Sequence, residues 1–271
     1  MQLLSTPAIV LRAHDYGESD RIVTFLTRDG GKLSGIAKGA KRSQRRFAGA
    51  LGLFCHVTLD YRHRPSAELA FLERAVLIRP WKSILDSLER FAAATHVVEV
   101  ADKMTVEHEV GDELYSVVLA ALARIDAAEP GPATLRLFEL ATLAACGYRA
   151  ELASCVVCRG SLLNGGGAPR LAPASGGAAC ARCAPRDDAT TAVSPSAIAH
   201  LASMQEALAR PGVRVDAGAL LDVEAAAVAG LTHALAREMA AALAALLAPH
   251  LRGRLRSAAV LGPILGRAFD G

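Results

Sequence analysis

Four cysteines in two C-x2-C pairs are the residues whose type and spacing most clearly indicate chemistry. Cys155 and Cys158 form the first pair, Cys180 and Cys183 form the second, and 21 residues separate the pairs. That separation is slightly wider than the span of about 15 to 20 residues that is usual in zinc ribbons. Zinc accepts a tetrahedron of four thiolates, which leaves no open position for water. The sequence therefore predicts a structural zinc site.

Three other interpretations of these cysteines stay open. Disulfides are disfavoured in a reducing cytoplasm, and a redox dithiol would need only one of the two pairs. A loop that has lost its metal is the third alternative. The connecting segment includes Gly165-Gly166-Gly167 and Gly176-Gly177 and offers little apolar surface for a core, so a bound metal would supply the folding free energy.

A second group of residues indicates binding rather than catalysis. Five cations and no acid lie within nine residues: Lys38, Lys41, Arg42, Arg45 and Arg46. This density favours contact with a phosphate backbone, and Lys32 is expected to extend the same DNA-binding surface. The alternative is a loop whose charges are simply solvated. Phe47 is expected either to stack on a base or to pack beneath the loop, and Gly35 and Gly39 would let the backbone approach phosphates.

The distribution of charge supports a polyanionic partner for the first third of the chain. Residues 1–80 hold 13 Lys and Arg against 7 Asp and Glu, whereas the remainder holds 17 against 20. A basic segment joined to a mildly acidic one is typical of a nucleic-acid-binding domain attached to a second domain. A smaller cluster, Arg252, Arg254 and Arg256, fits either helix C-terminal capping or DNA contact.

Short β-type runs precede and surround the basic segment. The runs are Ala8–Ala13, Arg21–Thr27, Lys32–Ala37, Phe54–Tyr61 and Leu69–Ile78, and Asp29-Gly30-Gly31 supplies a hairpin turn. Five strands with a long connection between the third and the fourth fit the Greek-key barrel called the OB-fold. A β-sandwich remains possible, because the alternation of apolar residues is imperfect.

After Trp81 the apolar period becomes helical, with Ser83 as a candidate N-cap and Ile84, Leu88, Phe91, Thr95 and Val98 on one face. Further helices are expected at 112–128, 133–146 with Gly147 as a left-handed cap, from Ser194-Pro195 to Leu208, and within 222–251. The predicted fold class is α+β and multidomain. It comprises an OB-fold barrel (1–80), an all-α domain in two parts (81–147 and 193–271) and an inserted zinc module (148–192).

The usual catalytic motifs are absent. The sequence has no Walker A loop, no Gly-x-Ser-x-Gly and no His-Glu-x-x-His. Asp15, Glu18 and Asp20 offer a possible Mg²⁺ site for a nuclease, although acids clustered in a turn are more often solvated. We therefore expect a protein that is not an enzyme.

Composition and segment lengths argue against a membrane protein. Hydrophobic residues make up 52% of the 271 residues, aromatic residues 4% and charged residues 21%, as in a globular chain. The apolar stretch Met239–Ala248 has about half the length needed to cross a bilayer, and Met1–Val10 lacks the features of a signal peptide. We expect a cytoplasmic, nucleoid-associated protein with no membrane partner.

Three stretches of the chain resemble the RecO family of bacterial recombination mediators. They are Ala8–Arg12 continuing through Asp15–Val23, Gly30–Ser43, and Cys146-Gly147-Tyr148 leading into Cys155-Val156-Val157-Cys158. With the second cysteine pair, the likeness spans nearly the whole chain. The resemblance implies an N-terminal OB-fold, a helical domain and, in many members, a four-cysteine zinc module.

The resemblance also implies partners. A member of this family binds single- and double-stranded DNA, anneals complementary strands, works with RecR and the single-stranded-DNA-binding protein, and helps to place RecA on gapped DNA. The acidic, apolar-tipped tail of the single-stranded-DNA-binding protein would need an apolar pocket rimmed by cations. A zinc-stabilised RNA-binding factor is the alternative from another class, because OB-folds also bind RNA.

Overall fold

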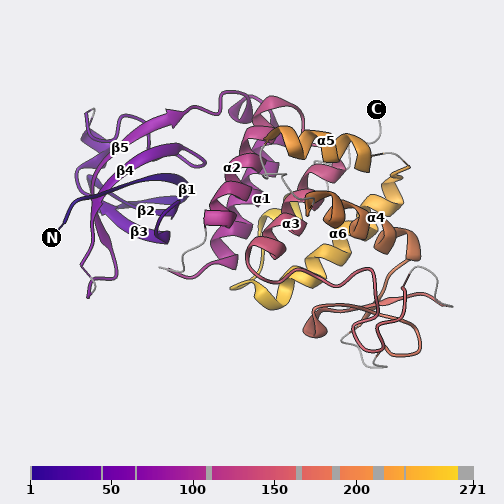
Figure 1. Cartoon of the computed structure of the whole chain (residues 1–271). Coiled ribbons are helices and arrows are strands. Elements are labelled where there is room, and N and C mark those ends of the chain that lie inside the picture. Colours follow the sequence, from indigo (N-terminus) through magenta and orange to yellow (C-terminus); the bar gives the residue numbers. More distant parts are fainter. Residues whose placement is uncertain are drawn as a thin grey trace.

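A computed structural model places three parts side by side in one chain (Figure 1). It describes residues 2–43, 45–64, 66–107, 112–162, 167–184, 190–209, 217–228 and 230–261. A β-barrel lies at one end, a group of helices lies next to it, and the cysteine-containing segment projects below the helices, away from the barrel. The predicted fold class, with an OB-type barrel and a helical domain, is confirmed.

Five antiparallel and parallel pairings close the N-terminal barrel. Its strands are β1 (Leu4–Tyr16), β2 (Asp20–Thr27), β3 (Gly31–Ala37), β4 (His56–Arg62) and β5 (Ala70–Arg79). They join in the order β1-β2-β3-β5-β4, and β4 pairs back with β1. This is the OB arrangement that the strand pattern predicts, so the β-sandwich alternative is wrong. Gly31 takes a positive φ of 66° at the β2–β3 hairpin, where its lack of a Cβ removes the steric penalty.

Gly35 allows the barrel to close. It pairs with Ala70 in the short parallel contact between β3 and β5, and a Cβ at this position would lie 2.4 Å from Leu72 Cδ2. A side chain here would push the two strands apart. The expectation that Gly35 lets phosphates approach the backbone is therefore wrong, because Gly35 is buried inside the closure.

Strand β1 is buried on both of its faces, because it belongs to two hydrophobic cores. Ala8 and Val10 point into the barrel, whereas Ile9 and Leu11 pack into the core of the helical domain. All four are at most 1% exposed. Successive side chains of a strand point to opposite sides, so a continuous apolar run is the pattern expected of a strand covered twice.

The helical domain contains six α-helices among the described residues. They are α1 (Leu88–Met104), α2 (Asp112–Ala127), α3 (Pro132–Ala145), α4 (Pro195–Leu208), α5 (Ala217–Ala227) and α6 (His233–Leu247), with short 3₁₀ turns η2 (Ser83–Leu85) before α1 and η4 (Ala248–His250) after α6. Ser194 caps α4 as predicted, and its hydroxyl accepts a hydrogen bond from the Ala197 N–H. Gly147 follows α3 with a φ of 80°, also as predicted.

Two expectations about α1 need correction. Ser83 begins η2, and the N-cap of α1 is Ser87, whose hydroxyl accepts from the Arg90 N–H. The prediction of an apolar buried face is also wrong for the first turns of α1, since Leu88 is 63% exposed and Phe91 is 39% exposed. Small residues form the buried face instead: Ala92, Ala93, Ala94, Val97, Val98, Val100 and Ala101. Alanines allow α1 to lie close to its neighbours, and a period counted only from large side chains misses them.

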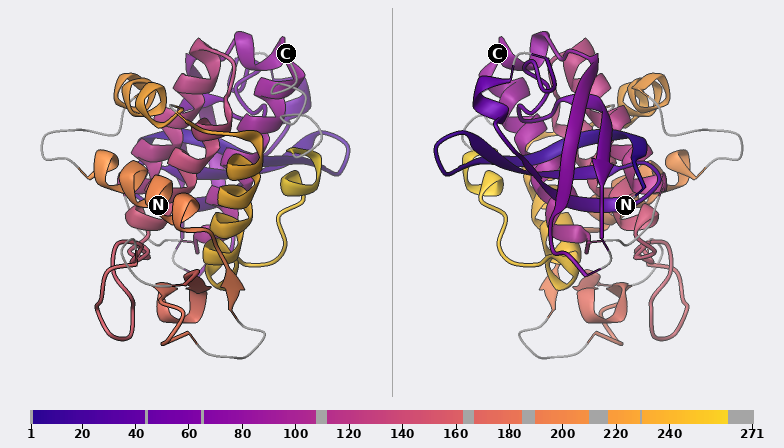
Figure 2. Two further views of the ribbon diagram at one scale, coloured as in Figure 1. Left: turned by 90° about the vertical axis from the view of Figure 1, so that its right-hand side faces the viewer. Right: turned by 90° about the vertical axis from the view of Figure 1, so that its left-hand side faces the viewer.

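The segment that carries the cysteines has little regular structure. Its strands are β6 (Arg170–Ala172), β7 (Gly177–Ala179) and β8 (Thr191–Ala192), in the order β7-β6-β8, and η3 (Pro173–Ser175) joins the first two. Figure 2 shows this segment beneath the helices in both views. No helix among the described residues has the length and hydropathy that a membrane crossing requires.

Candidate nucleic-acid interface and metal centre

The basic loop, residues 38–46, begins where β3 ends and starts with a left-handed residue. Gly39 has a φ of 65°, and the single 3₁₀ turn η1 (Ala40–Arg42) follows it. Lys38, Lys41, Arg42 and Arg45 are exposed, whereas Arg46 is half-buried. Gln44 lies outside the described residues. Most of the cations predicted to bind DNA therefore face solvent from one short loop.

Acids of the β1–β2 turn hold this loop in place. Asp20 Oδ1 accepts a hydrogen bond from the Gly39 N–H at 2.8 Å, and the Ser19 carbonyl accepts from the Lys41 N–H at 3.0 Å. Lys41 Nζ lies 3.0 Å from Asp15 Oδ2. The Lys41 hydrogen bond lowers the pKa of Asp15, and the Gly39 N–H lowers the pKa of Asp20. These carboxylates therefore anchor the loop.

The geometry of these acids does not support the nuclease site that the sequence left open. Asp15 pairs with Lys41 and Arg21, and Asp20 binds the backbone of the basic loop. Within the part of the chain that the structure describes, the four cysteines are the one group of three or more His, Cys, Asp or Glu placed to hold a metal ion. Asp15, Glu18 and Asp20 do not gather in that way.

Phe47 packs beneath the loop, which was one of its two predicted positions. Its side chain is 2% exposed and belongs to the barrel core. The Arg46 guanidinium lies over the ring, 5.1 Å from its centroid, and donates to the Lys38 carbonyl at 2.6 Å. A buried ring cannot stack on a base. Arg46 therefore stabilises the fold of the loop in addition to carrying charge.

Lys32 lies between the barrel and the helical domain. Its ammonium is 2.6 Å from Asp102 Oδ1 and donates to the Asp102 carbonyl at 2.7 Å. The side chains of Lys32 and Asp102 are 12% and 10% exposed. Arg12 approaches the same carboxylate from the solvent side, at 3.1 Å. The position of Lys32 indicates a structural ion pair between domains, so we leave it out of the DNA surface proposed below.

The loop cations thus divide by their partners. Lys41 binds Asp15 and Arg46 binds backbone and ring, whereas Lys38, Arg42 and Arg45 form no side-chain ion pair with any described residue. Lys38 helps to lower the pKa of Asp20 without forming an ion pair with it, and positive charges that are not paired in this way attract anions from solution. These three residues are the part of the loop that is free to contact phosphates.

The four predicted cysteines come together in space. Their Sγ atoms all lie within 4.8 Å of one another, and Cys158 Sγ is 3.9 Å from Cys180 Sγ. A tetrahedral zinc–thiolate site has bonds of about 2.3 Å and hence sulfur–sulfur separations of about 3.8 Å. The donor set and its spacing fit a tetrahedral metal ion, and four thiolates would leave that ion no open position.

Backbone contacts place the two cysteine pairs. The Glu151 backbone pairs with the β7 end, where its N–H donates to the Gly176 carbonyl and its carbonyl accepts from the Ala178 N–H, both at 2.9 Å. A Cβ on Gly177 would lie 2.2 Å from the Glu151 carbonyl oxygen, so only glycine fits. Because each cysteine pair follows one of these paired segments, the pairing brings the four thiols to one point.

The electrostatics of the cluster favour a bound cation. Burial raises the pKa of the Cys155 thiol, but N–H donors of Cys158, Cys180 and Val157 outweigh it and the pKa is about 6. Hydrogen bonds with Cys180 and Cys158 raise the pKa of Cys183 to about 12. One sulfur is therefore held as a thiolate while a neighbour retains its proton. A metal ion would remove this conflict, because it binds all four sulfurs as thiolates.

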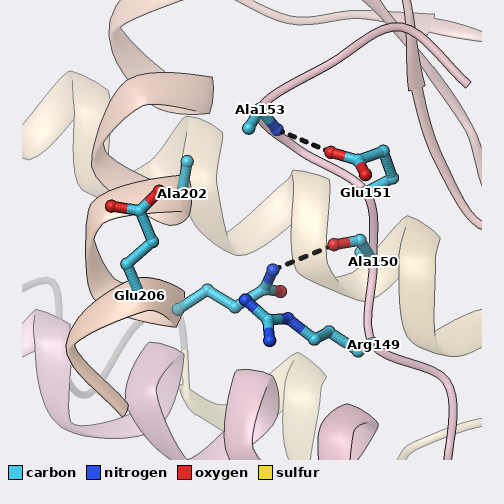
Figure 3. Close-up of a pocket in the computed structure, with 7 residues that line it drawn as sticks. Arg149, Ala150, Glu151, Ala153, Ala202 and Glu206 are labelled. Carbon is cyan, nitrogen blue, oxygen red and sulfur yellow. Dashed lines mark hydrogen bonds between the residues drawn. The ribbon is translucent and has the colours of Figure 1, made fainter. Parts of the chain in front are cut away.

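A small polar pocket marks where the cysteine segment joins the helical domain (Figure 3). Gln205 of α4 donates from Nε2 to the Ala150 carbonyl at 3.0 Å, and Glu151 Oε1 accepts from the Ala153 N–H at 3.1 Å. Gln205 is 9% exposed, so this hydrogen bond is largely shielded from water. The first cysteine pair is thereby positioned from α4 as well as from β7.

Sequence reasoning missed the structural roles of Asp20 and Asp102. Both interact with groups far away in the chain: Asp20 with Gly39, and Asp102 with Lys32. One signal was available for Asp102, which directly follows the small apolar residues Val100 and Ala101 of α1. A charge in such a position indicates a buried partner. Nothing local distinguishes Asp20 from a solvated turn residue.

Comparison with known proteins settles which family shares this arrangement. The model named "Recombination protein O N terminal" matches residues 1–81, and the model named "Recombination protein O C terminal" matches residues 85–259. The chain belongs to the RecO family. The two matched ranges meet between β5 and α1, where the barrel ends and the helical domain begins.

Individual relatives cover nearly the same length. "DNA repair protein RecO" of Anaeromyxobacter dehalogenans (strain 2CP-C) is 37% identical over 245 residues, which is 89% of this chain and 95% of the relative. The protein of the same name from Anaeromyxobacter sp. (strain Fw109-5) is 39% identical over 240 residues, covering 88% and 93%. That from Myxococcus xanthus is 36% identical over 226 residues, covering 82% and 91%.

Proposed function

We propose that this protein is a non-catalytic recombination mediator in DNA repair. It binds single- and double-stranded DNA, anneals complementary strands and, with RecR, helps to load RecA onto gapped DNA that is coated with the single-stranded-DNA-binding protein. Membership in a family named for recombination and the names of the relatives support the role in repair. The finer steps rest on the charge and geometry of the basic loop.

The physical obstacle to annealing is repulsion between two polyanions. Each phosphate that a cation neutralises releases condensed counter-ions and lowers that repulsion, and no covalent bond has to break. A cationic surface on a rigid barrel is therefore sufficient for this activity. A nucleophile, a general base or a hydrolysable nucleotide is not required.

The observation that carries the proposal is the exposed charge of Lys38, Arg42 and Arg45. These side chains face solvent and form no ion pair with a described residue, and Asp15 and Asp20 fix the loop that presents them. A loop anchored before DNA arrives loses less conformational entropy on binding. Lys41 is adjacent and exchanges Asp15 for a phosphate at modest cost, because surface ion pairs contribute little.

The decisive experiment is annealing of complementary oligonucleotides that are already coated with the single-stranded-DNA-binding protein, without ATP. The wild-type protein is expected to anneal them, and the variant K38A/R42A/R45A is expected to anneal them far more slowly. The variant R42K/R45K keeps the charge and should retain most of the activity. Failure of the wild-type protein to accelerate annealing would refute the proposal.

We also propose that the metal at the four cysteines is zinc. Four thiolates at tetrahedral spacing are a typical structural zinc donor set, and Cys155 is fully buried at the centre of the module. Elemental analysis of the purified protein tests the identity of the ion. Iron in place of zinc would contradict the proposal.

An apolar groove offers a site for the acidic tail of the single-stranded-DNA-binding protein. The groove has a volume of about 950 Å³ and lies between α2, α3 and α4, with Val117, Leu140 and Leu208 among its lining. Three exposed arginines from separate elements line it as well: Arg28, Arg79 and Arg149. Arg28 pairs with Asp112 at 3.4 Å and Arg79 with Asp126 at 3.9 Å, so Arg149 is the arginine of this lining that forms no ion pair with a described residue.

A tail peptide tests this assignment. A fluorescent peptide with the acidic, apolar-tipped tail sequence should bind the wild-type protein, and R149E should weaken binding by at least tenfold, since a favourable charge becomes a repulsive one. The exposed Arg237 on α6 lies outside the groove lining, so R237E serves as the matched control. Equal losses in both variants would indicate a nonspecific effect of charge.

The RNA-binding alternative is tested with matched ligands. Single-stranded DNA and RNA of one sequence are compared at one salt concentration, because affinities for nucleic acids depend strongly on salt. The proposed function predicts annealing of coated DNA together with an affinity for DNA at least equal to that for RNA. Strong preference for RNA without annealing would favour the alternative.

A further inference from the structure

The chain turns back along α1 after its last long helix. We call residues 251–257 the strap; it follows η4, and Figure 2 shows this yellow segment leaving the lower end of α6 as a separate length of chain. The Arg252 N–H donates to the Lys103 carbonyl at 2.9 Å. The N–H groups of Arg256 and Ser257 donate to the two oxygens of Glu99, at 2.9 and 2.8 Å. The strap therefore runs antiparallel to the end of α1.

The strap is held through its backbone groups, which bind the Glu99 carboxylate and the carbonyl and ammonium of Lys103, and not through the side chains of its arginines. Arg252, Arg254 and Arg256 are exposed. Their guanidinium groups make no hydrogen bond or ion pair with any described residue, and they cap no helix there. Of the two roles open for this cluster from the sequence, helix capping is met by the backbone N–H of Arg252, which donates to the Lys103 carbonyl in the last turn of α1, and DNA contact stays a prediction. Three arginines whose charge has no internal partner resemble the free cations of the basic loop.

The strap meets the barrel at a shared group of charges. Lys103, which binds the strap through its carbonyl, directly follows Asp102, the residue that pairs with Arg12 of β1. The side chain of Arg12 is 60% exposed. Positive charge therefore continues from the strap, past Lys103, to the outer side of β1. The two acids in this region already have partners: Asp102 pairs with Arg12 and Lys32, and Glu99 accepts hydrogen bonds from the backbone of the strap.

Strand β1 then connects this group to the basic loop. Asp15, which binds Lys41, lies three positions after Arg12, and a strand rises about 3.3 Å per residue, so these two positions are roughly 10 Å apart along β1. That distance spans about three phosphates of one strand in a double helix, where the rise is about 3.4 Å, and fewer in a more extended single strand. Arg12 and Asp15 are an odd number of positions apart, so their side chains leave β1 on opposite faces, and a single strand that contacts both clusters has to pass around the edge of β1.

We propose that the strap is a second phosphate-binding surface that extends the DNA path from the basic loop, past Arg12, onto the helical domain. This inference rests on the proposed function and adds the residues by which the helical domain takes part in it. The partner is single-stranded DNA, recognised through its phosphates, and the strap contributes Arg252, Arg254 and Arg256.

Salt dependence of binding tests the strap. For single strands, each lost phosphate contact lowers the slope of log affinity against log salt by about 0.7, so R252A/R254A/R256A should lower it by roughly 2 for an oligonucleotide long enough to reach both clusters. An oligonucleotide that only covers the loop should show no difference. The backbone hydrogen bonds of the strap survive these substitutions, and circular dichroism checks the fold. R252K/R254K/R256K should restore the slope, and R237A should leave it unchanged.

The outcomes separate the strap from the proposed function. If the loop variant K38A/R42A/R45A lowers the slope and the strap variant does not, the strap is not a DNA contact and the mediator function stands. If the wild-type protein neither binds nor anneals DNA, the proposed function itself fails. A strap variant that loses affinity only for the acidic tail peptide would assign these arginines to a protein partner and overturn the inference.

Discussion

The cysteine module and the basic loop differ in whether their ionisable side chains point toward one another or out into solvent. In the cysteine module, four sulfurs converge within 4.8 Å of one another, whereas Lys38, Arg42 and Arg45 of the basic loop diverge into solvent. The barrel that carries the loop has its own core, so its surface charges are not needed for folding. The buried apolar residues of the module, among them Leu152, Leu162 and Leu171, belong to the core of the helical domain, so the four cysteines are the groups that join its own loops to one another. The contrast teaches that a charged cluster supports binding where a separate core supports the fold.

Removing the metal is the strongest way to test this contrast. Structural zinc contributes about 10–16 kcal/mol of apparent binding free energy in zinc-finger peptides, so C155S is expected to abolish metal binding and unfold the module. Elemental analysis and limited proteolysis within 148–192 measure this. C55S, outside the cluster, should keep the metal. A C155S protein that resists proteolysis like the wild type would show that the module folds without its ion.

Lys32 provides the next largest effect and separates structural from binding charge. Removing one partner of a buried pair costs roughly 3–5 kcal/mol, and Arg12 next to Asp102 reduces this, so K32M should destabilise the protein by about 2–4 kcal/mol. Urea denaturation measures the free energy of unfolding. R28A breaks an exposed pair with Asp112 and should cost less than about 1 kcal/mol. A stable K32M protein with a reduced salt slope would instead place Lys32 on the DNA surface.

The closure of the barrel can be disturbed without changing any charge. In G35A, the new Cβ meets Leu72 and the carbonyl of Ala70, so the free energy of unfolding should fall by about 1–3 kcal/mol. Thermal denaturation provides the measurement. G52A is the matched control, because a Cβ there makes only ordinary contacts, with Cys55 Sγ at 3.5 Å and the Gly49 carbonyl oxygen at 3.8 Å. Equal stabilities for the two variants would mean that β3 and β5 separate easily.

The basic loop should show the opposite behaviour, with binding changed and stability retained. K38A/R42A/R45A removes three phosphate contacts and should lower the salt slope for single strands by about 2. Exposed residues without partners alter stability by about 0.5 kcal/mol or less at each site. Filter binding at several salt concentrations and urea denaturation give the two values. A large loss of stability would show that the loop charges support the fold after all.

The smallest effect concerns the anchor of the loop. The Gly39 N–H lowers the pKa of Asp20 below its ordinary value of 3.8, so this hydrogen bond supports the loop above that value. The support is lost as the pH falls through the folded-state pKa. The amide resonance of Gly39 should follow this titration by NMR, and D20N should remove the pH dependence. A Gly39 resonance that ignores the ionisation of Asp20 would contradict the anchor.

Local signals were sufficient for much of this structure. The two C-x2-C pairs, Ser194-Pro195 at the start of α4 and Gly147 after α3 were all readable, because their chemistry depends on neighbours in sequence. Contacts between distant residues were not readable. The Lys32–Asp102 pair joins positions 70 residues apart, and the burial of Phe47 depends on how the barrel closes around it. The pattern of large side chains on α1 also predicted the wrong buried face, because alanines form that face.

The burial of β1 on both of its faces opposes a hinge motion between the barrel and the helical domain. Separating the two would expose Ile9 and Leu11 to water at a cost of about 1.5–3 kcal/mol for each side chain, in addition to breaking the Lys32 pair. The barrel and the helical domain therefore stay packed against each other in the folded state. The basic loop and the helical groove therefore stay at a constant distance from each other. A ligand bound at the basic loop and a ligand bound at the groove are therefore held at a fixed angle to each other.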